Sequence, residues 1–524
     1  MAPKKTNGTR SANQKLRANG QRPPEGRDGD ILTMEQAIAL LKTTRPTFYR
    51  WLRSGKIKGM KAGRQWRFYR EDVERFVRGE APRIELRADL SPFVKRLERR
   101  FEEISGGNPR DVLKKAAAGD DEVLRSVMLI IALGVRLGAS DIHIAPHIRE
   151  ASGRHAGVLR YRVDGVLHPE ADFDARLLPA IAERWKIMAD CDVHEKMRPQ
   201  DGRVLVEIEG REIDLRVNFL AASHGESITA RILDRDAVKL SLDRIDYCPA
   251  DREKLLKALH ASCGMIVITG PTGCGKSTAL YAVLNGAAGP DVKTITVENP
   301  VEYYLPWAVQ VEIRPQAGLT FPAAMRSALR ADPDIILVGE IRDLETLMIA
   351  DQASLTGHLV LTTLHAADAV GALVRMVEMG SDPFIVGDAT RLSMSQRLVR
   401  KLCPTCSIAA EPPRSLLELA EKLAVSGGIQ WNALKAGFRK AVGCPACAGL
   451  GFKSRTVISE ILPVTAEIGG ALRRRASADE IRETAVAQGM TTMAADGIRR
   501  AASGETTLEE VFGVLGLGME RNGR

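Results

Sequence analysis

The sequence predicts an α/β protein built from three folded parts. From Asp251 to the C-terminus, apolar segments with strand character alternate with helical segments, a pattern typical of a parallel sheet with covering helices. Between residues 120 and 245, period-two alternation dominates, which predicts an α+β domain. A small module of helices and a hairpin precedes it. The chain of 524 residues is too long for one core, in agreement with several domains.

Positive charge is concentrated at the N-terminus. The net charge is +9, but residues 1–80 carry 19 Lys or Arg against 8 Asp or Glu, a balance of +11, and the other 444 residues carry −2. Binding to nucleic acid or an anionic surface is therefore expected only of the N-terminal part. The chain starts without an apolar leader, and no run approaches the roughly 18 apolar residues of a spanning helix. These features predict a soluble, cytoplasmic protein.

The N-terminal part divides into an arm and a folded module. Residues 1–29 are rich in Lys, Arg, Asn, Gly and Pro, so we expect a disordered basic arm. In residues 30–80, Thr33 and Gln36 form a capping box before a first helix. The pattern then predicts a helix over 45–53, a two-stranded wing over 57–68 that turns at Ala62-Gly63, and a helix over 70–77. This order resembles the small winged helix-turn-helix of the excisionase and MerR-like group.

Cations are placed where winged helices meet duplex DNA, on the second helix and the wing. They are Arg45, Arg50, Arg53, Lys56, Lys58, Lys61, Arg64 and Arg67. One interpretation is DNA binding. The other is a reused fold that docks on a protein or on anionic lipid. Both interpretations stay open from the sequence.

A polar, charge-rich linker is expected over residues 81–119, and the α+β domain over 120–245. Its expected elements are a helix over 121–137, the segment ASDIHIAP at 139–146, a strand at 158–167, a helix near 176–190, and strands at 204–207, 212–218 and 227–233.

The segment IVITGPTGCGKST at 266–278 is a P-loop, in which an apolar strand feeds a glycine turn and then a helix. Its glycines let backbone N–H groups point at phosphate oxygens together with the positive end of the helix. We expect ATP to bind here, with Lys276 at the β and γ phosphates and Ser277 on Mg²⁺. The predicted nucleotide-binding residues are Gly270, Pro271, Thr272, Gly273, Cys274, Gly275, Lys276, Ser277 and Thr278. A cysteine at position 274 predicts thiol sensitivity of the loop.

Acidic and histidine residues follow the next predicted strands. Glu298 in TVENPVEY is placed to polarise water, and Glu340 ends the buried strand in DPDIILVGEIRD. Because the carboxyl ends of parallel strands face the ligand crevice, Glu340 is expected beside the phosphates and Mg²⁺. His358 and His365 bracket a further strand and are candidate sensors of the γ-phosphate.

Four of the eight cysteines form two CxxC pairs, at Cys403 and Cys406 and at Cys444 and Cys447. Two knuckles supply the four thiolates of a structural Zn²⁺ site, and no ligand position stays open for chemistry. The pairs define a tetracysteine zinc subdomain over residues 396–455.

The order of these motifs resembles the secretion ATPases of type II secretion and type IV pilus assembly (the GspE/PilB group). The resemblance covers about residues 120–520 and includes ASDIHI, RYRVDGVL, RPQDGR, the P-loop, the Glu298 and Glu340 segments, the histidines and QRLVRKLCPTC. It implies a RecA-like P-loop ATPase core over 246–524, a homohexamer, and an inner-membrane platform protein as partner. It further implies a cytoplasmic location peripheral to the inner membrane.

The resemblance also gives roles to residues that spacing alone leaves ambiguous. It implies that Arg216 and Arg231 reach nucleotide phosphates and are catalytic together with Glu298, Glu340 and His365. Where the family usually has Glu-Asp, this chain has Glu298-Asn299, which keeps hydrogen bonding but removes a charge.

The whole chain has three functional interpretations. The leading hypothesis is a hexameric ATPase motor for pseudopilus or pilus assembly. A DNA-binding regulator with a nucleotide-switch domain is the alternative from another class. A retraction-type motor is disfavoured, because retraction motors of the superfamily generally lack the tetracysteine insert.

Overall fold

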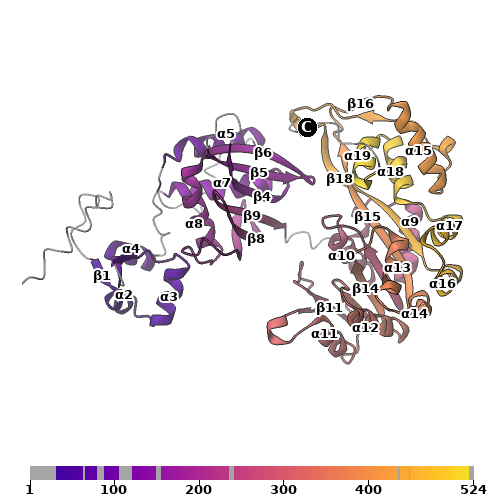
Figure 1. Ribbon diagram of the computed structural model, residues 1–524, viewed down its shortest axis with the longest axis horizontal. Coiled ribbons are helices and arrows are strands. Elements are labelled where there is room, and N and C mark those ends of the chain that lie inside the picture. Colours follow the sequence, from indigo (N-terminus) through magenta and orange to yellow (C-terminus); the bar gives the residue numbers. More distant parts are fainter. Residues whose placement is uncertain are drawn as a thin grey trace, which may run out of the picture. The chain divides into compact units, whose positions relative to one another are not determined.

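The computed structural model describes residues 31–62, 65–78, 86, 88–105, 121–148, 155–234, 241–434, 437–447 and 449–517. The predicted basic arm lies outside the described residues. The chain divides into two compact units, Met1–Leu233 and Asp234–Arg524 (Figure 1). The division falls earlier than the predicted boundary at residue 245, because Leu242 and Tyr247 pack into a core of the second unit.

The N-terminal module of the first unit is a winged helix-turn-helix. Its elements are β1 (Ile31–Thr33), α2 (Met34–Leu40), α3 (Arg45–Arg53), β2 (Met60–Ala62), β3 (Gln65–Tyr69) and α4 (Arg70–Val77), with strand order β1-β3-β2. The predicted capping box is present: the Gln36 N–H donates to Thr33 Oγ1 (3.2 Å) and the Thr33 N–H donates to Gln36 Oε1 (2.8 Å). Phe48, Leu52 and Phe68 form part of a small core between the helices and the sheet.

The rest of the first unit is a six-stranded sheet of order β6-β5-β4-β9-β8-β7 with helices on one face (Figure 1). Its elements are α5 (Ser91–Ser105), α7 (Glu122–Arg136), β4 (Ala139–Ile148), β5 (His155–Val163), β6 (Val166–Asp174), α8 (Leu178–Met188), β7 (Gln200–Ile208), β8 (Arg211–Ala222) and β9 (Gly225–Asp234). Helix α5 lies inside the segment expected to be a linker. Its apolar residues Phe93, Leu97 and Phe101 join the core of the sheet, so this part of the segment belongs to the α+β domain.

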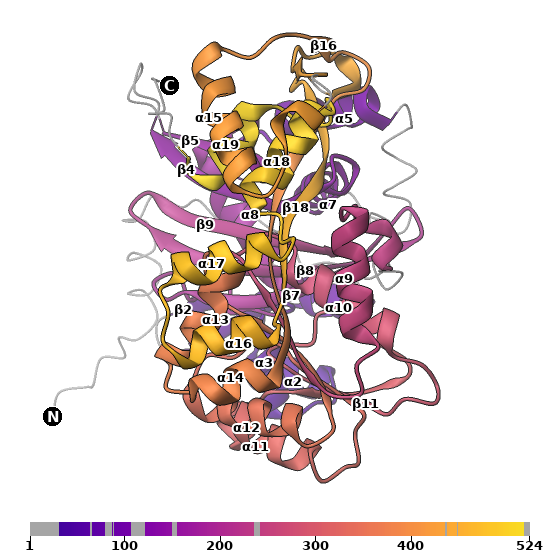
Figure 2. The ribbon, with the colours of Figure 1, turned by 90° about the vertical axis from the view of Figure 1, so that its right-hand side faces the viewer.

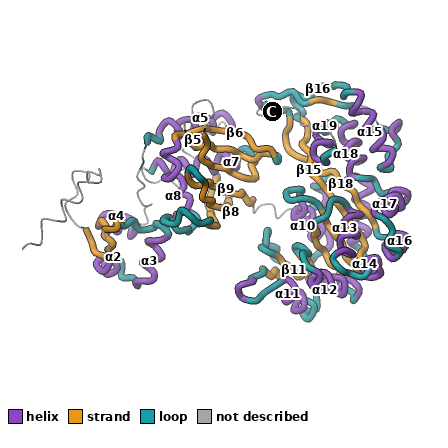
Figure 3. Tube along the Cα trace, in the orientation of Figure 1, coloured by secondary structure: helices purple, strands orange, loops and turns teal. Residues whose placement is uncertain are grey.

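The second unit contains a seven-stranded sheet of order β12-β11-β13-β14-β10-β15-β18, mostly parallel, with β18 antiparallel to β15. Its first elements are α9 (Pro249–Leu259), β10 (Gly264–Thr269), α10 (Lys276–Ala287), β11 (Thr294–Glu298), β12 (Ala308–Glu312), α11 (Phe321–Ala328), β13 (Ile335–Val338), α12 (Leu344–Leu355), β14 (Leu359–Leu364), α13 (Ala369–Glu378), α14 (Pro383–Ala389) and β15 (Thr390–Leu402). Figure 3 shows this alternation of strands and helices. It is the α/β arrangement that the sequence predicts.

Helices cover both faces of this sheet. Alternate residues of the central strand β10 pack into two different cores. Met265 and Val267 pack with α12 and α13, whereas Ile266 and Ile268 pack with α9 and α10. A strand buried on both faces has to be largely apolar, as β10 is from Met265 to Ile268. The strand that carries the P-loop is thus held from both sides.

The remaining elements extend from the β15–β18 edge. They are β16 (Ile408–Ala409), α15 (Arg414–Ser426), β17 (Arg439–Lys440), β18 (Phe452–Pro463), α16 (Ala466–Arg473), α17 (Ala478–Ala487), α18 (Met493–Ala502) and α19 (Leu508–Leu515). Helices α15, α18 and α19 share a core with Val399 of β15 and Ile458 of β18 (Figure 2). Across the described ranges, no helix combines the length and the apolar character that crossing a membrane requires.

Candidate active site

The P-loop joins the carboxyl end of β10 to the first turn of α10. Gly270, Gly273 and Gly275 all have positive φ, at 144°, 79° and 88°, a region that L side chains rarely adopt. A Cβ at Gly270 would lie 2.6 Å from Cys274 Sγ and 2.8 Å from the Gln396 carbonyl oxygen. Glycine is therefore required at position 270 for both conformation and space. The loop is tight enough to present its backbone N–H groups to phosphate at a helix N-terminus.

Lys276, Ser277 and Thr278 open α10, and Pro271, Thr272 and Gly273 are exposed. The Lys276 ammonium donates to the carbonyl oxygens of Gly270 (2.7 Å) and Pro271 (3.0 Å). Burial lowers the pKa of Lys276, and the nearby carboxylate of Glu340 opposes this effect. Ser277 is exposed in the first turn, a position from which its hydroxyl suits Mg²⁺.

Glu340 lies at the carboxyl end of β13, close to Lys276 and His365. One carboxylate oxygen lies 3.6 Å from His365 Nε2, and the other pairs with Arg342 at 2.5 Å. Parallel pairing of β13, β14 and β10 brings these side chains to the same edge of the sheet. The structure thus brings together the P-loop, Glu340 and His365 in the way the sequence predicts.

Glu298 ends β11, and its side chain is almost fully buried, with 3% of the residue exposed. Its carboxylate accepts hydrogen bonds from Tyr281 Oη (2.6 Å), Thr296 Oγ1 (2.7 Å) and Gln310 Nε2 (3.4 Å). Burial raises the pKa of Glu298, and these three donors oppose the rise. Position and protonation of this carboxylate therefore depend on Tyr281 of α10.

His358 lies at the opposite end of β14 from His365. The Gly264 N–H donates to its carbonyl oxygen (3.1 Å), and Gly264 begins β10, whereas the P-loop follows the other end of β10. Its Nδ1 lies 3.1 Å from the Ala353 carbonyl oxygen. The prediction that His358 binds the nucleotide does not agree with this position within one chain, because strand polarity separates it from the loop.

Three contacts at the loop were missed from the sequence. Gln396 of β15 donates from its amide to the Cys274 carbonyl oxygen (3.0 Å) and accepts from Tyr247 Oη (2.7 Å). Arg397 lies beside Gly270, where its charge helps to lower the pKa of Lys276. Strand β15 carries several other polar residues besides Gln396, so the sequence offered no specific signal for these contacts. Cys274 is buried, and burial raises the pKa of its thiol, so the predicted thiol sensitivity is not supported.

Arg216 and Arg231 belong to the first unit, on the face of its sheet away from the helices. Their strand neighbours Leu215 and Ala230 point into the helix-covered core, so the two arginines point to the other face. Arg231 Nε donates to Asp141 Oδ1 (3.1 Å). Arg216 lies opposite Arg203 in the β7–β8 register, and Arg203 is paired with Asp214. This face of the sheet therefore carries these three arginines, and two of them are paired with carboxylates.

The two CxxC pairs meet at the connected end of the β15–β18 strand pair, where β15 ends and β18 begins. The four sulfurs all lie within 4.8 Å of one another, with Cys403–Cys444 at 3.9 Å and Cys406–Cys447 at 3.8 Å. Tetrahedral Zn²⁺ with bonds of about 2.3 Å requires sulfurs about 3.8 Å apart. The cluster therefore fits a metal ion of this kind. The Gly443 and Gly451 N–H groups donate to Cys406 Sγ (3.3 Å) and Cys447 Sγ (3.2 Å) and support thiolate ligands.

The predicted basic surface of the winged helix-turn-helix is only partly free. Arg45, Arg50 and Arg53 are exposed along α3. Lys56 is paired with Asp190 of the loop after α8 (2.8 Å). Lys58 and Arg67 are half-buried, and Arg67 donates to Gln65 Oε1 (2.7 Å). Arg64 and the turn at Gly63 lie outside the described residues.

Comparisons with known proteins agree with this geometry. The model of the family "Type II/IV secretion system protein" matches residues 116–513, and a "Helix-turn-helix domain" model matches 31–81. The chain is 41% identical to type II secretion system protein HxcR of Pseudomonas aeruginosa, over 75% of this chain and 77% of that protein. It is 36% identical to the type IV pilus assembly ATPase PilB of Myxococcus xanthus, over 85% of this chain and 76% of that protein.

A solved structure supports the fold. The X-ray structure of the Legionella pneumophila ATPase DotB matches with a TM-score of 0.54 at 20% identity, over 74% of this chain and 95% of that one. At this identity the likeness concerns the fold alone. Together with the family match, it supports a core built as a P-loop ATPase. The chain belongs to the type II/IV secretion system protein family.

Proposed function

We propose that this chain is an ATP-hydrolysing motor that drives assembly of a pseudopilus in type II secretion or of a type IV pilus. The observation that carries the proposal is the meeting of the P-loop, Glu340 and His365 at one edge of the sheet, in a member of this family. An acidic strand end beside a P-loop lysine is the arrangement that phosphoryl transfer needs.

We assign each predicted site residue a role in this reaction or in the fold. Lys276 and the loop N–H groups bind the β and γ phosphates, and Ser277 and Glu340 hold Mg²⁺, which neutralises phosphate charge when it is bound. Glu298 accepts a proton from the attacking water, and His365 donates to the γ-phosphate. Arg216 and Arg231 supply cations to charge that develops in the transition state. The four cysteines hold structural Zn²⁺.

The working form is proposed to be a homohexamer on an inner-membrane platform protein, at the cytoplasmic side of the membrane. One of the relatives reported above is named as a type II secretion system protein and the other as a type IV pilus assembly ATPase, which supports a secretion or pilus machine. Within the family, the tetracysteine cluster favours the assembly branch over retraction motors.

A matched pair of variants tests the motor. Glu340→Gln keeps the size of the side chain and removes its charge, so we expect ATP turnover to fall about 10²–10³-fold while nucleotide still binds. Glu345→Gln, an exposed carboxylate five residues on that is paired with Arg326, is expected to keep the wild-type rate. Phosphate release and binding of a fluorescent ATP analogue measure the two properties. Wild-type turnover in Glu340→Gln would contradict the proposal.

The winged helix-turn-helix offers a second function, binding of duplex DNA. The exposed arginines of α3 favour DNA binding, because the second helix of helix-turn-helix modules is the one that meets the DNA, whose phosphates attract cations. Docking on a protein or anionic lipid is the other outcome; Lys56 is already paired with Asp190 of the same chain (2.8 Å).

Binding of the full chain to pooled genomic fragments over a salt series separates these outcomes. If α3 contacts phosphate, Arg50→Ala weakens binding and lowers the slope of log K against log salt by about 1, whereas Lys422→Ala on α15 changes neither. Enrichment of particular fragments at physiological salt indicates sequence reading. Weak binding that ignores sequence and vanishes with salt assigns the module to docking.

A further inference from the structure

One peptide of the P-loop, between Cys274 and Gly275, is held by a side chain from outside the loop. Gln396 of β15, which is 2% exposed, donates from Nε2 to the Cys274 carbonyl oxygen (3.0 Å). A Cβ at Gly275 would lie 3.2 Å from the same Nε2, so the amide packs directly against the glycine. Because this peptide is planar and trans, its carbonyl oxygen and its N–H point to opposite sides. The Gly275 N–H therefore points away from Gln396.

The orientation of this peptide matters because Gly275 immediately precedes Lys276 and the first turn of α10. Backbone N–H groups at this point of a P-loop surround the phosphates. Glycine offers little resistance to rotation of the peptide, since both halves of φ are open to it. A rotated peptide would turn its carbonyl oxygen, which carries a partial negative charge, to the side of the phosphates. The hydrogen bond from Gln396 opposes this rotation.

Tyr247 sets the orientation of the Gln396 amide. A carbonyl oxygen only accepts hydrogen bonds, so the amide has to present Nε2 to Cys274 and Oε1 to its other side. Tyr247 Oη donates to this Oε1 at 2.7 Å, and the residue is 5% exposed. Burial raises the pKa of Tyr247, so its hydroxyl stays protonated and remains a donor. The tyrosine thus stabilises the amide orientation that the P-loop peptide requires.

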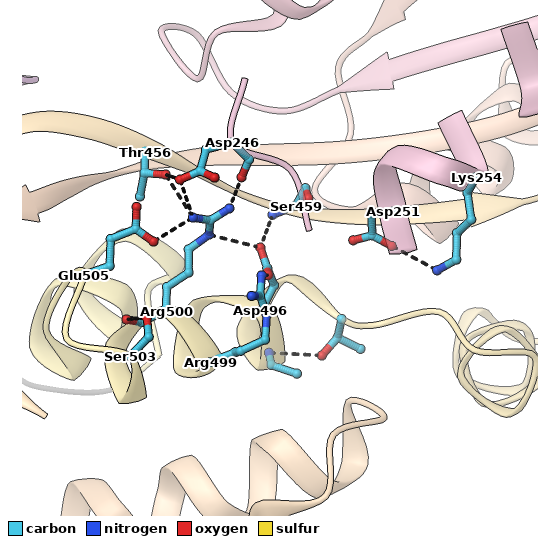
Figure 4. Close-up of polar contacts among 12 residues, drawn as sticks. Asp246, Asp251, Lys254, Thr456, Ser459, Asp496, Arg499, Arg500, Ser503 and Glu505 are labelled. Carbon is cyan, nitrogen blue, oxygen red and sulfur yellow. Dashed lines mark hydrogen bonds and ion pairs between the residues drawn. The ribbon is translucent and has the colours of Figure 1, made fainter. Parts of the chain in front are cut away.

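Arg500 of α18 holds the chain immediately before Tyr247. Its guanidinium donates to the Asp246 carbonyl oxygen and to Asp246 Oδ2 (3.2 Å). It also donates to Thr456 Oγ1 of β18 (3.1 Å) and to Glu505 Oε2 (2.8 Å). Figure 4 shows the guanidinium with these three residues around it, and the side chain of Arg500 is 4% exposed. The backbone that carries the tyrosine is therefore fixed by elements outside the P-loop.

We propose that Tyr247 and Gln396 are positioning residues for the nucleotide, which hold the Cys274–Gly275 peptide with its N–H toward the phosphates. The inference rests on the proposed ATP site. Tyr247 acts through Gln396, and Gln396 acts through the peptide. The N–H that they orient binds phosphate in the ground state and in the transition state alike. Loss of either side chain therefore raises the Kd of nucleotide and KM more than it lowers kcat.

Equilibrium binding of Mg-ADP to the full-length protein measures the effect in a double-mutant cycle. Tyr247→Phe removes the hydroxyl and keeps the ring, and Gln396→Met keeps the length of the side chain and removes the amide. A hydrogen bond to a charged group is worth about tenfold to a hundredfold in affinity. We expect Kd to rise about tenfold in Tyr247→Phe and about tenfold to a hundredfold in Gln396→Met. Because Tyr247 acts through Gln396, the double variant should bind no more than about twofold more weakly than Gln396→Met alone.

Tyr161→Phe is the matched control, because it removes another buried hydroxyl, which donates to the Ile130 carbonyl oxygen (2.8 Å) in the first unit. It should lower Tm and leave the Kd of Mg-ADP unchanged. An unchanged Kd in Tyr247→Phe overturns the inference. So does a double variant whose rise in Kd is the product of the two single rises, or a fall in kcat with KM unchanged.

The same experiment separates this inference from the proposed motor. A wild-type protein that binds Mg-ADP but does not hydrolyse ATP contradicts the motor, and the Kd values still decide the positioning roles. A wild-type protein that does not bind Mg-ADP overturns both. If Gln396→Met fails to fold, the comparison of Tyr247→Phe with Tyr161→Phe decides.

Discussion

Replacing Tyr281 with Phe tests how the buried acid of the candidate active site is controlled. The ring of Tyr281 packs in the core beneath the P-loop, and only its hydroxyl reaches Glu298, at 2.6 Å from Oε2. The substitution removes this donor and keeps the shape of the side chain. Thr296 and Gln310 remain on the other oxygen, so Oε2 is left without a partner.

The size of the effect follows from the strength of a hydrogen bond to a charged group, about 1.5–3 kcal/mol. Because Tyr281 stabilises the charged form, its loss raises the pKa of Glu298 further above its ordinary value. The folded protein then loses stability as the pH rises through the interval between the unfolded and folded pKa values. The variant should therefore match wild type at acid pH and fall behind it at neutral and alkaline pH.

Two assays read out this change. At about 1.4 kcal/mol per pH unit, the acid limb of the ATPase pH profile moves about 1–2 units toward higher pH. At about 2 °C per kcal/mol, the deficit in Tm grows from near zero at about pH 4.5 to about 3–6 °C at about pH 8. Tyr304→Phe, at a tyrosine that is 62% exposed, is the control. A Tm deficit that does not depend on pH would refute the hydrogen-bond argument, and an unmoved acid limb would refute Glu298 as the base.

Two further predictions concern the second unit. Asp351 is 2% exposed and accepts a hydrogen bond from Ser381 Oγ (2.6 Å), and burial raises its pKa to about 6. Above pH 6 the buried carboxylate is charged, so Asp351→Asn should raise the free energy of unfolding by up to about 3 kcal/mol. Near pH 4 the same substitution should change the free energy of unfolding little. Chemical denaturation at the two pH values checks this, and equal effects at both would contradict it. Cys444→Ser should abolish the bound Zn²⁺ of about one per chain and lower Tm, whereas Cys263→Ser leaves both unchanged. Metal analysis and thermal melts measure the difference.

Local signals in the sequence were sufficient to predict several elements. Helix α3 and helix α4 begin and end at the predicted residues, because Pro46 and Gly55 bound the first and the wing bounds the second. The strand, glycine turn and helix of the P-loop are a single continuous motif, and its chemistry is carried by the backbone. The four-sulfur cluster could be predicted from the two cysteine pairs in the same way, because the CxxC spacing itself places two sulfurs together.

Residues far apart in the chain could not be paired from spacing. The hydrogen bond between Tyr281 and Glu298 depends on how α10 crosses the sheet, which the sequence pattern does not specify. The sequence predicts a linker where helix α5 lies, because the charged residues of the helix mask an apolar face that is recognisable only once the sheet is in place. The prediction for His358 neglected strand polarity: a residue that precedes a parallel strand, as His358 precedes β14, lies at the edge away from the ligand crevice.

The hairpin that carries the cysteines is part of the support of the P-loop. Strand β15 pairs with β10 on one side and with β18 on the other, so one strand contacts both the loop-bearing strand and the hairpin partner. Gln396 in β15 holds the Cys274 carbonyl oxygen, and Cys403 follows the end of the same strand. A metal that fixes the connected end of the strand pair, where β15 ends and β18 begins, therefore limits movement of β15. We expect a structural Zn²⁺ site to support nucleotide binding through this strand, although no cysteine of the cluster contacts the nucleotide loop.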